Sequence, residues 1–395
     1  MRPYGRSYGM VVGTAGRRSV RGGEKMEQTK TATRDYPSFS DTPWGLWETL
    51  YARRSHRKYL PGEIDAPLVK QLRETARLAV AVRGSAEESL IVVDDAALVT
   101  RIKQRLHKGM QGKINLWLNR SPLRGFLVLA LPREDVRSER PQMLPLASVA
   151  AEDVVLWLTE AGMGTCWLGG INQREIREAL GLGKDMFVPA VIPFGRPKAQ
   201  VKARDMDHMM YRRISRKRKP LVEIAYLESV DRHYAEPQLA RGSFAASSTQ
   251  DIGGLLQQLK EKRESSGDTP LDLAVDACFE AARIAPSAGN AQKWHFVAVS
   301  EGDALGKLAQ ACGVENAWRT AIVGAGDVEM GFLYEKMEKP FWMIDLPIAF
   351  SQMSLMAASM DLAVDLGLRG IDEKAVNALT GLRPPLRAVG VMGIR

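Results

Sequence analysis

The chain has few cysteines, no long apolar run and no dinucleotide-binding glycine motif, and each absence excludes a class of protein. Its 395 residues include three cysteines, with no C-x-x-C pair, which argues against a disulfide framework and favours a reducing compartment. No stretch approaches about 18 uncharged apolar residues, so we expect no membrane-spanning helix and a cytoplasmic protein. No G-x-G-x-x-G follows an early strand, which disfavours a classical dinucleotide fold.

Metal and nucleic-acid binding are also disfavoured. The five histidines have no metal-ligand spacing, so no metal site is predicted. The net charge is +9, and much of the excess lies in residues 1–25 and 212–219. Because no aromatic residues are interleaved with these basic runs, we expect no nucleic-acid partner.

One pattern occurs twice, at residues 74–84 and 280–290, and the two copies have kept different parts. The helical frame of Glu, Ala and Arg matches, but only the second copy continues into a loop with polar Ser and Asn. Conversely, the first half holds a basic cluster, Arg53–Arg57, at a place where the second half has Leu259, Glu261 and Arg263. Each half is complete where the other is defective, which indicates one shared site.

The composition divides the chain into four parts. Residues 1–42 are rich in Gly, Arg, Ser and Thr without a sustained period, which predicts a disordered basic arm. Residues 43–198 and 251–395 form two lobes, joined by a basic connector at 199–250. Neither lobe has a regular βαβ rhythm, so we predict the α+β class, each lobe being a small mixed or antiparallel sheet flanked by helices.

Hydrophobic periodicity predicts the elements of both lobes. Helices are expected over residues 43–54, 67–80, 146–161, 173–180, 270–284, 345–366 and 373–379. Strands are expected over residues 90–93, 125–131, 188–194, 295–299, 321–324 and 388–392.

The basic cluster is the first candidate binding motif. Arg53, Ser55 and Arg57 alternate just past a predicted helix end, with Arg54 between them. In an extended segment, residues two apart point to one side, and guanidinium groups recognise oxyanions through paired, charge-assisted hydrogen bonds. The pattern therefore suits a phosphate or another anionic group. The alternative is a solvated basic helix terminus, placed favourably against the helix dipole.

A polar loop between a predicted helix and strand is the second candidate. Pro286 ends the helix, Gly289 permits an unusual backbone conformation, and Ser287 and Asn290 present short polar groups. Such a loop can satisfy the donors and acceptors of a flat heteroaromatic ring. The alternative is a helix stop that satisfies only its own backbone.

At these residues the chain resembles the flavin-dependent nitroreductase family. In that family an R-R-S-x-R cluster, an A-P-S-x-x-N-x-Q-P-W loop and a late G-x-x-x-C-W-I-G-G segment form the FMN site. The three matches are Arg53–Arg57, Ala285–Trp294, in which Lys293 replaces the usual Pro, and Gly162–Gly170. The resemblance covers residues 43–227 and 250–395, nearly the whole chain outside the basic arm.

The resemblance implies a shared cofactor site. Family members are usually homodimers with two FMN sites at the interface, so this chain would be a monomeric, single-chain pseudo-dimer with one FMN. The implied cofactor-binding positions are Arg53, Arg54, Ser55, Arg57, Gly169, Gly170, Arg216, Arg218, Pro286, Ser287 and Asn290. A charged linker is the alternative for Arg216 and Arg218. The second half has Gly-Leu-Arg-Gly370 in place of the glycine segment and no basic tail after Arg395, so its own site is expected to be absent.

The resemblance also implies the chemistry. It suggests an FMN-dependent oxidoreductase that transfers hydride from the co-substrate NAD(P)H to a small conjugated or nitroaromatic acceptor. A main-chain N–H near Gly169 or Gly170 would contact flavin N5, and Arg57 would stabilise the anionic reduced flavin. No catalytic side chain is predicted. The alternatives are a dehalogenase or flavin-consuming oxygenase of the same superfamily, and a non-catalytic flavin-binding protein.

Two further sets of residues have open roles. Trp117 and the run Phe341–Met343 are expected either to roof a substrate pocket over the flavin or to pack in the core. Cys166 is expected to be a small buried residue.

Overall fold

Two sheets, one in each half of the chain, organise the structure. The computed structural model describes residues 45–106, 108, 113–198, 218–235, 250–261, 264–265, 269–315, 317–329 and 340–395. All of them belong to one unit, Tyr36–Arg395. The predicted arm at 1–42 and Arg216 lie outside the described residues. No helix in the described ranges is both long enough and apolar enough to cross a bilayer.

The first lobe contains a four-stranded antiparallel sheet of order β1-β2-β6-β4. Its strands are β1 (Leu90–Val93), β2 (Gly125–Leu129), β4 (Gly164–Thr165) and β6 (Val191–Gly195), and β3 (Leu131–Pro132) pairs with β5 (Met186–Phe187) beside it. The helices are α1 (Leu46–Ala52), α2 (Ala66–Arg83), α3 (Ala96–Leu106), α5 (Arg133–Arg137), α6 (Met143–Glu160) and α7 (Gln173–Ala179), with 3-10 turns η1 (Glu87–Ser89) and η2 (Lys113–Arg120).

The second lobe repeats this order around a five-stranded sheet, β10-β11-β9-β8-β7. Its strands are β7 (Ala225–Leu227), β8 (Trp294–Val299), β9 (Thr320–Asp327), β10 (Val364–Gly367) and β11 (Leu386–Ile394). The helices are α9 (Ile252–Glu261), α10 (Leu271–Ile284), α11 (Gly302–Ala311), α13 (Trp342–Ser359) and α14 (Glu373–Thr380), with 3-10 turns η3 (Leu221–Glu223) and η4 (Ala288–Asn290).

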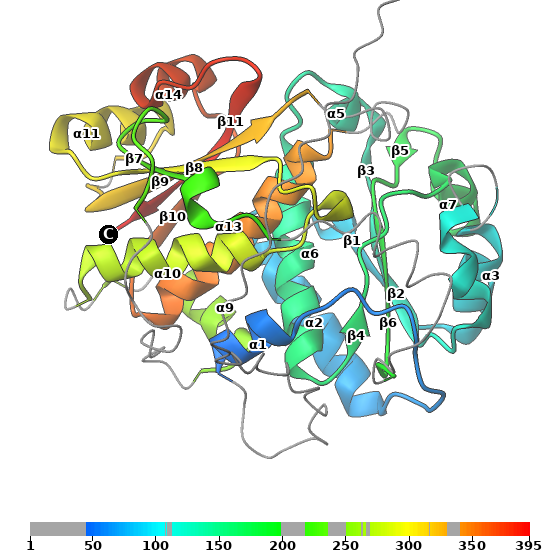
Figure 1. Cartoon of the computed structure of the whole chain (residues 1–395). Helices are drawn as coiled ribbons and strands as arrows, with labels where there is room; N and C mark the ends of the chain where they lie inside the picture. Colours follow the sequence, from blue (N-terminus) through cyan, green and yellow to red (C-terminus); the bar gives the residue numbers. More distant parts are fainter. Residues whose placement is uncertain are drawn as a thin grey trace, which may run out of the picture. The chain divides into compact units, whose positions relative to one another are not determined.

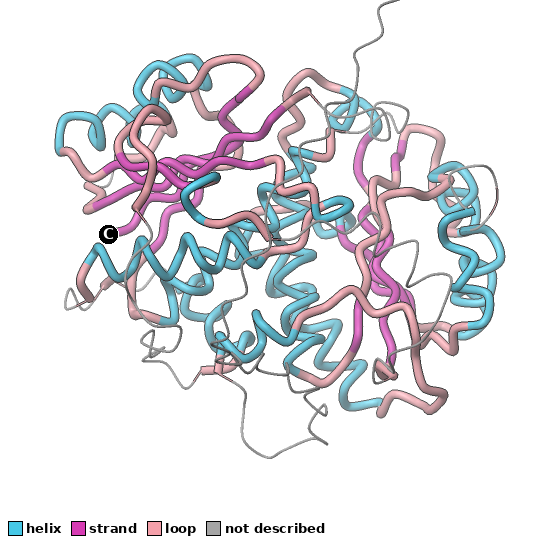
Figure 2. The backbone as a smooth tube through the Cα atoms, in the orientation of Figure 1, coloured by secondary structure: helices cyan, strands magenta, loops and turns pink. Residues whose placement is uncertain are grey.

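The two lobes are copies of one arrangement. In both, four antiparallel strands follow the same spatial order, so that β1-β2-β6-β4 corresponds to β8-β9-β11-β10. The long helices α6 and α13 pack against each other between the two sheets (Figures 1 and 2). The predicted α+β class with two similar lobes in one chain is therefore confirmed.

Helices α6 and α13 form the core between the lobes. Every residue of α13 is buried, as is nearly every residue of α6. A helix that is apolar all round is stable only when neighbours cover all of its faces, and here the other long helix and helices of both lobes do so. The few polar groups on these helices hydrogen-bond one another: Ser351 Oγ donates to Asp153 at 2.6 Å, and Gln352 Nε2 donates to Glu152 at 2.9 Å.

Part of the predicted connector belongs to the second sheet. Strand β7 lies parallel to β8, with Ala225 opposite Phe296, and forms the edge of that sheet. The Tyr234 hydroxyl, farther along the connector, donates to Asp276 of α10. Within the predicted connector, 199–250, strand β7 and Tyr234 thus pack on the second lobe.

One predicted helix is too long. It was expected to run to residue 366, but α13 ends at Ser359 and the chain turns at Asp361, whose φ is 58°. The apolar residues that follow form strand β10 instead. The sequence does not predict the end of this helix, because the turn contains no glycine or proline. The shorter amphipathic helices α3, α9 and α11 were not predicted.

Candidate functional site

The basic cluster lies between the end of α1 and the edge strand β4. The Arg53 N–H donates to Thr49 O and ends the helix. Ser55 then forms a bridge with Thr165 of β4, and the His56 N–H donates to Thr165 O at 2.8 Å. The segment is therefore extended at Ser55, as the alternation of the basic residues predicts. It lies directly beside the glycine segment, Gly162–Gly170.

The arginines of this cluster differ in burial. Arg53 is 5 % exposed, whereas Arg54 is exposed and donates to the main-chain oxygens of Tyr51 and Arg53. Burial, and then the charges of Arg53, Arg54 and Arg57, lower the pKa of His56 to about 4. The histidine is neutral at physiological pH, so the local positive charge is carried by guanidinium groups alone.

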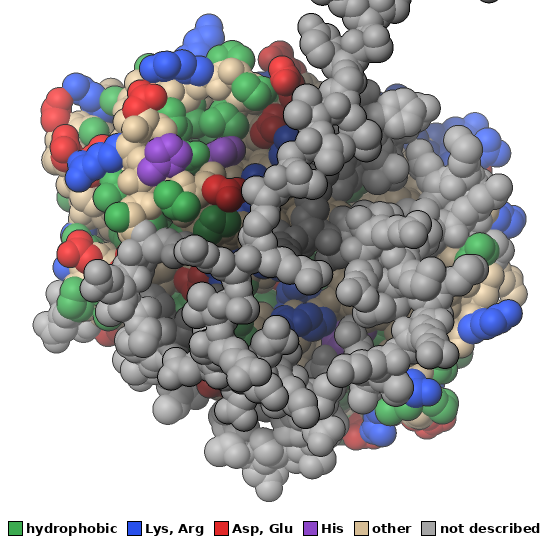
Figure 3. All heavy atoms as spheres, in the orientation of Figure 1, with side chains coloured by type: hydrophobic (Ala, Val, Ile, Leu, Met, Phe, Trp, Pro, Cys, Tyr) green, Lys and Arg blue, Asp and Glu red, His purple; other side chains and the backbone are tan. Residues whose placement is uncertain are grey.

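Arg218 joins this cluster from the connector. Its guanidinium donates to the main-chain oxygens of Ile284, at 2.8 Å, and Ala285, which end α10. Burial, followed by the charges of Arg53, Arg283 and Arg54, lowers the pKa of Arg218 to about 9. The structure therefore brings Arg53 and Arg218 together, although they are far apart in the sequence. Figure 3 shows Lys and Arg atoms (blue) in the central part of the face, near the place where Figure 1 shows the end of α1.

One carboxylate links this cluster to α10. Glu280 accepts from the Tyr51 hydroxyl at 2.7 Å and from Arg283 at 2.5 and 2.6 Å. Tyr51 belongs to α1, so Glu280 fixes the end of the first-lobe helix against the second-lobe helix that leads into the polar loop.

The polar loop, residues 285–292, joins α10 to β8. The helix ends at Ile284, just before Pro286, as predicted. Gly289 and Asn290 both adopt left-handed backbone angles, with φ of 56° and 51°, a region that glycine and asparagine enter more readily than other residues. The Ser287 hydroxyl accepts from the Gln292 N–H at 3.0 Å. The Ser287 side chain therefore hydrogen-bonds the backbone of its own loop, as the alternative reading of the motif expected. The exposed Gly289 and the half-buried Asn290 lie at the tip of the loop.

The connector also holds this loop. The Lys219 N–H donates to Gln292 Oε1 at 2.8 Å, and Gln292 Nε2 donates to Asn290 O at 3.1 Å. Together with the bonds from Arg218 to the end of α10, these contacts fasten the loop to the segment that follows the first lobe.

The glycine segment approaches the second lobe closely at Gly169. A Cβ at this position would lie 2.5 Å from the Phe341 ring, a separation that real Cβ atoms do not tolerate. The next residue, Gly170, accepts from Asn115 Nδ2 at 2.7 Å. In this structure the Phe341 ring therefore occupies the space beside Gly169.

The aromatic residues with open roles are buried. Phe341, Trp342 and Trp117 are 4 %, 7 % and 8 % exposed, and Met343 is fully buried. Trp117 stacks on Tyr59, with ring centroids 6.3 Å apart. Core packing is thus the reading that the structure supports. Cys166 is buried as expected, at 1 % exposure.

The sequence motifs gave no role to Glu152 of α6, which contacts the glycine segment at Trp167. It accepts from Trp167 Nε1 at 2.8 Å and from Gln352 of α13. Burial raises its pKa to about 7, against the opposing charge of Arg53. A carboxylate inside a long, largely apolar helix is the sequence signal that could have revealed it, because such residues are rarely buried without a partner.

The corresponding place in the first lobe is built differently. Helix α2 continues to Arg83, which the repeat aligns with Gly289, and Gly84 ends it with a φ of 62°. Arg83 donates to Asp153 of α6 at 2.7 and 3.0 Å, with side chains 4 % and 0 % exposed. The helix of the first copy therefore ends five aligned residues later than that of the second, and its last residue, Arg83, forms a buried ion pair.

The residues that meet here fit a cofactor with an anionic group and a flat ring. Arg53, Arg54, Arg57 and Arg218 concentrate positive charge that a phosphate would neutralise, since like charges in a partly buried site oppose one another. Gly169, which has no side chain, already lets one flat ring, that of Phe341, lie against its backbone. No group of three or more His, Cys, Asp or Glu suited to a metal ion is found in the described part of the chain.

Two protein-family models match parts of the chain. A model described as "Putative TM nitroreductase" matches residues 148–242, and the model of the nitroreductase family matches residues 269–317. The two matches follow one another along the chain, the first beginning in the first lobe and the second lying in the second lobe. No curated protein matches the chain.

Several solved structures align with the chain. An FMN-dependent nitroreductase from Clostridium difficile is 26 % identical over 42 % of this chain and 94 % of its own, with a TM-score of 0.31. An NADPH:FMN oxidoreductase from Vibrio harveyi, complexed with NAD+, is 21 % identical over 40 % and 72 %, with a TM-score of 0.31. A Thermotoga maritima protein described as a putative nitroreductase is 16 % identical over 84 % and 94 %, with a TM-score of 0.39. Because these TM-scores are low, the similarity to the nitroreductase family depends on the two family models.

Proposed function

We propose that this chain, a tandem member of the nitroreductase family, is an FMN-dependent oxidoreductase with one flavin between its two lobes. The family matches support flavin-dependent oxidoreduction in general. The observation that carries the proposal of one shared site is the meeting of Arg53 from the first lobe with Arg218 at the end of α10, where the polar loop begins. A site assembled from different parts of the two lobes forms once in the chain.

The roles of the chain's residues follow from their placement. Arg53, Arg57 and Arg218 would bind the anionic parts of FMN through charge-assisted hydrogen bonds. Ser287 and Asn290 would border the ring at the tip of the loop, and main-chain N–H groups at Gly169 and Gly170 would face its reacting edge. When bound, FMN supplies the hydride chemistry, and the protein supplies orientation and electrostatics.

The co-substrate and acceptor belong to the same proposal. We assign NAD(P)H as the hydride donor and a small conjugated or nitroaromatic compound as the acceptor, in a protein that acts as a monomer in the cytoplasm. The V. harveyi structure, whose description names NADPH, FMN and NAD+, supports this choice of donor. The arginines would stabilise negative charge that develops on the reduced ring, because a fixed positive charge acts most strongly in a site that excludes water.

The test measures flavin stoichiometry and reduction. We expect the purified chain to bind one FMN per chain, and anaerobic NADH or NADPH to bleach the flavin absorbance. Arg53→Lys should weaken FMN binding about tenfold, because lysine keeps the charge but loses the planar donor fork. The matched control is Arg73→Lys, since Arg73 pairs with Asp94 at an exposed position of α2, and it should leave binding unchanged. A ratio near two flavins per chain, or equal binding by both variants, would contradict the shared site.

A further inference from the structure

The first turn of α13 contacts both lobes at the site. The ring of Phe341, which caps this helix, lies against Gly169 of the first lobe. The carboxylate of Asp345 accepts from the Ala288 N–H of the polar loop, at 3.1 and 3.0 Å. The Asp345 N–H donates to Phe341 O at 2.8 Å. Residues four apart lie on the same side of a helix, so a single turn joins the glycine segment to the polar loop.

We propose that Asp345 is a positioning residue that holds the polar loop on α13 and thereby sets the affinity of the site for its cofactor. The inference rests on the proposed function, because it takes FMN as the ligand that the loop helps to bind.

The surroundings of Asp345 give the reason. The residue is 9 % exposed, and no salt bridge of its carboxylate occurs among the described residues. Burying a carboxylate without a cationic partner is costly, and burial raises the pKa of Asp345 to about 7, against the opposing effect of the Ala288 N–H. A neutral core residue would avoid this cost. What the carboxylate adds is an acceptor for the loop.

The charged groups around Asp345 already have other partners. Lys293 lines the same small cavity as Asp345, beside the loop, but its Nζ pairs with Asp327 at 2.6 Å. Arg387 lies over the ring of Trp342, 5.5 Å from its centroid, and pairs with Glu373 at 2.8 Å. Neither cation forms an ion pair with Asp345, whose carboxylate accepts from the Ala288 N–H.

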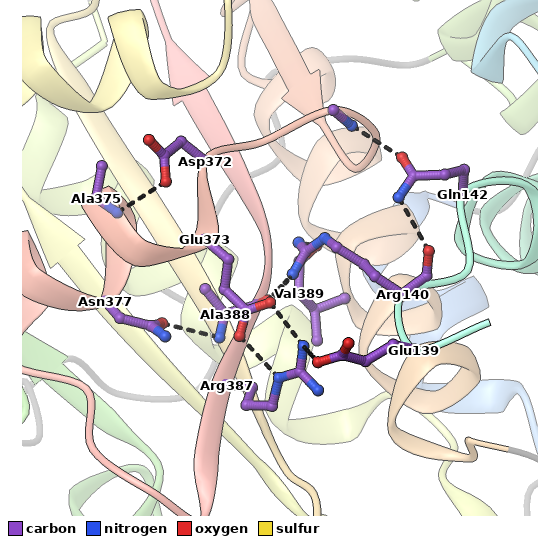
Figure 4. Close-up of polar contacts among 11 residues, drawn as sticks. Glu139, Arg140, Gln142, Asp372, Glu373, Ala375, Asn377, Arg387, Ala388 and Val389 are labelled. Carbon is purple, nitrogen blue, oxygen red and sulfur yellow. Dashed lines mark hydrogen bonds and ion pairs between the residues drawn. The ribbon is translucent and has the colours of Figure 1, made fainter.

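The turn that carries Asp345 is itself fixed. Trp342 packs against Gly326 of β9, where an added Cβ would lie 2.9 Å from the Trp342 Cβ. Figure 4 shows Glu373 between Arg387 of the second lobe and Arg140 of the first, and Arg140 also donates to Ala388 O at 3.1 Å. The start of α13 is thus held through Trp342 and Arg387 in a network that spans both lobes. A loop bonded to this turn takes its position from both lobes.

The other contacts of the loop leave a distinct task for Asp345. Ser287, Gln292 and Lys219 fasten the loop to itself and to the connector. The bond from Ala288 to Asp345 fastens it to α13. Removing the carboxylate should therefore loosen the loop locally and leave the connector side attached.

The experiment compares Asp345→Ala with Asp345→Asn. The first removes the acceptor, and the second keeps an amide oxygen that can accept from the Ala288 N–H. In the FMN-free chain, hydrogen exchange over residues 285–292 should be about tenfold faster in Asp345→Ala, the size expected for losing one hydrogen bond to a charged group. The dissociation constant for FMN, measured by flavin fluorescence, should rise by a similar factor. Asp345→Asn should restore both within about threefold.

Glu160 provides the matched control. Its carboxylate is half-buried, its pKa is likewise raised to about 7 by burial, and it accepts from the Ile252 N–H at the start of α9 at 3.1 Å. Glu160→Ala should change neither exchange in the loop nor FMN binding.

Several results would overturn the proposal. These are unchanged exchange and binding in Asp345→Ala, or equal weakening by the Ala and Asn variants. If Asp345→Ala does not fold, Asp345→Val, which fills the same volume without an acceptor, takes its place with the same expected results. If the wild-type chain binds no FMN, the proposed function fails, whereas the exchange measurement still decides whether Asp345 holds the loop.

Discussion

The buried ion pair between Arg83 and Asp153 allows a quantitative prediction about the lobe interface. The two side chains are 4 % and 0 % exposed and share two hydrogen bonds, of 2.7 and 3.0 Å, so solvent screens them little. Asp153 also accepts from Ser351 of α13. Replacing Arg83 by Met keeps an unbranched side chain but removes the guanidinium, which leaves Ser351 as the remaining side-chain donor to the Asp153 carboxylate. We expect the free energy of unfolding to fall by about 3 to 5 kcal/mol, the usual cost of an uncompensated buried charge.

The assay is urea denaturation of the FMN-free chain, followed by circular dichroism. The double variant Arg83→Met with Asp153→Leu removes both charges, and apolar replacements of similar volume often match a buried pair in stability. We therefore expect the double variant to lie within about 1.5 kcal/mol of the wild type, well above the single variant. A single variant within about 1 kcal/mol of the wild type, or a double variant as unstable as the single one, would refute the assignment of this pair as a closed, desolvated contact.

Two further predictions concern the site and its pH dependence. Gly169→Ala should weaken FMN binding and lower the melting temperature, because its Cβ would lie 2.5 Å from the Phe341 ring; Phe341→Leu in the same chain should restore the melting temperature, and no restoration would disprove the steric explanation. The raised pKa of Asp345, about 7, means that the folded chain keeps a proton that the unfolded chain releases above about pH 4. This contribution to stability is present at low pH and is lost as the pH rises from about 4 to 7. Between pH 4.5 and 8 the melting temperature should therefore fall less steeply with rising pH in Asp345→Asn than in the wild type.

The sequence predicts the long elements well because burial of one helix face requires apolar residues at periodic positions. Helices α2 and α6 lie within three residues of their predicted bounds at each end. Strand β7 could not be foreseen, since a three-residue edge strand is defined by its parallel partner β8 far along the chain. Strand β10 was predicted as part of a helix, because its apolar residues follow α13 after a turn at Asp361 that contains no glycine or proline.

For the site, too, the sequence motifs predicted some features, whereas contacts between distant residues could not be predicted. The motifs predicted that Arg53 and the region of Pro286 lie near each other, because a defect in each half pointed to a shared site. In the structure, Arg218 lies near Arg53 and donates to Ala285 O. The motifs did not reveal that Arg218 binds the main-chain oxygens at the end of α10, or that Asp345 accepts from Ala288. Both contacts join residues that are distant in sequence, so no local pattern records them. Carboxylates within otherwise apolar helices are the one signal that points to Asp345 and Glu152.

Glu152 and Asp153 are neighbours on α6, yet they contact different sides of the interface. Successive residues of a helix point about 100° apart. Glu152 accordingly accepts from Trp167 in the glycine segment and from Gln352, whereas Asp153 pairs with Arg83 and Ser351. The first carboxylate supports the proposed flavin site, and the second occupies the side where the first copy of the motif continues as helix.

This difference makes the two carboxylates a test of the asymmetry of the chain. Glu152→Ala removes the acceptor for Trp167, two residues before Gly169, and should raise the dissociation constant for FMN about tenfold. Asp153→Asn should lower the melting temperature, because its amide cannot neutralise Arg83, and should leave FMN affinity unchanged. Changes at two adjacent residues should thus affect different properties: FMN affinity at Glu152 and melting temperature at Asp153. If Asp153→Asn weakened FMN binding as much as Glu152→Ala, both sides of the interface would contribute to binding, and the single-site arrangement would be wrong.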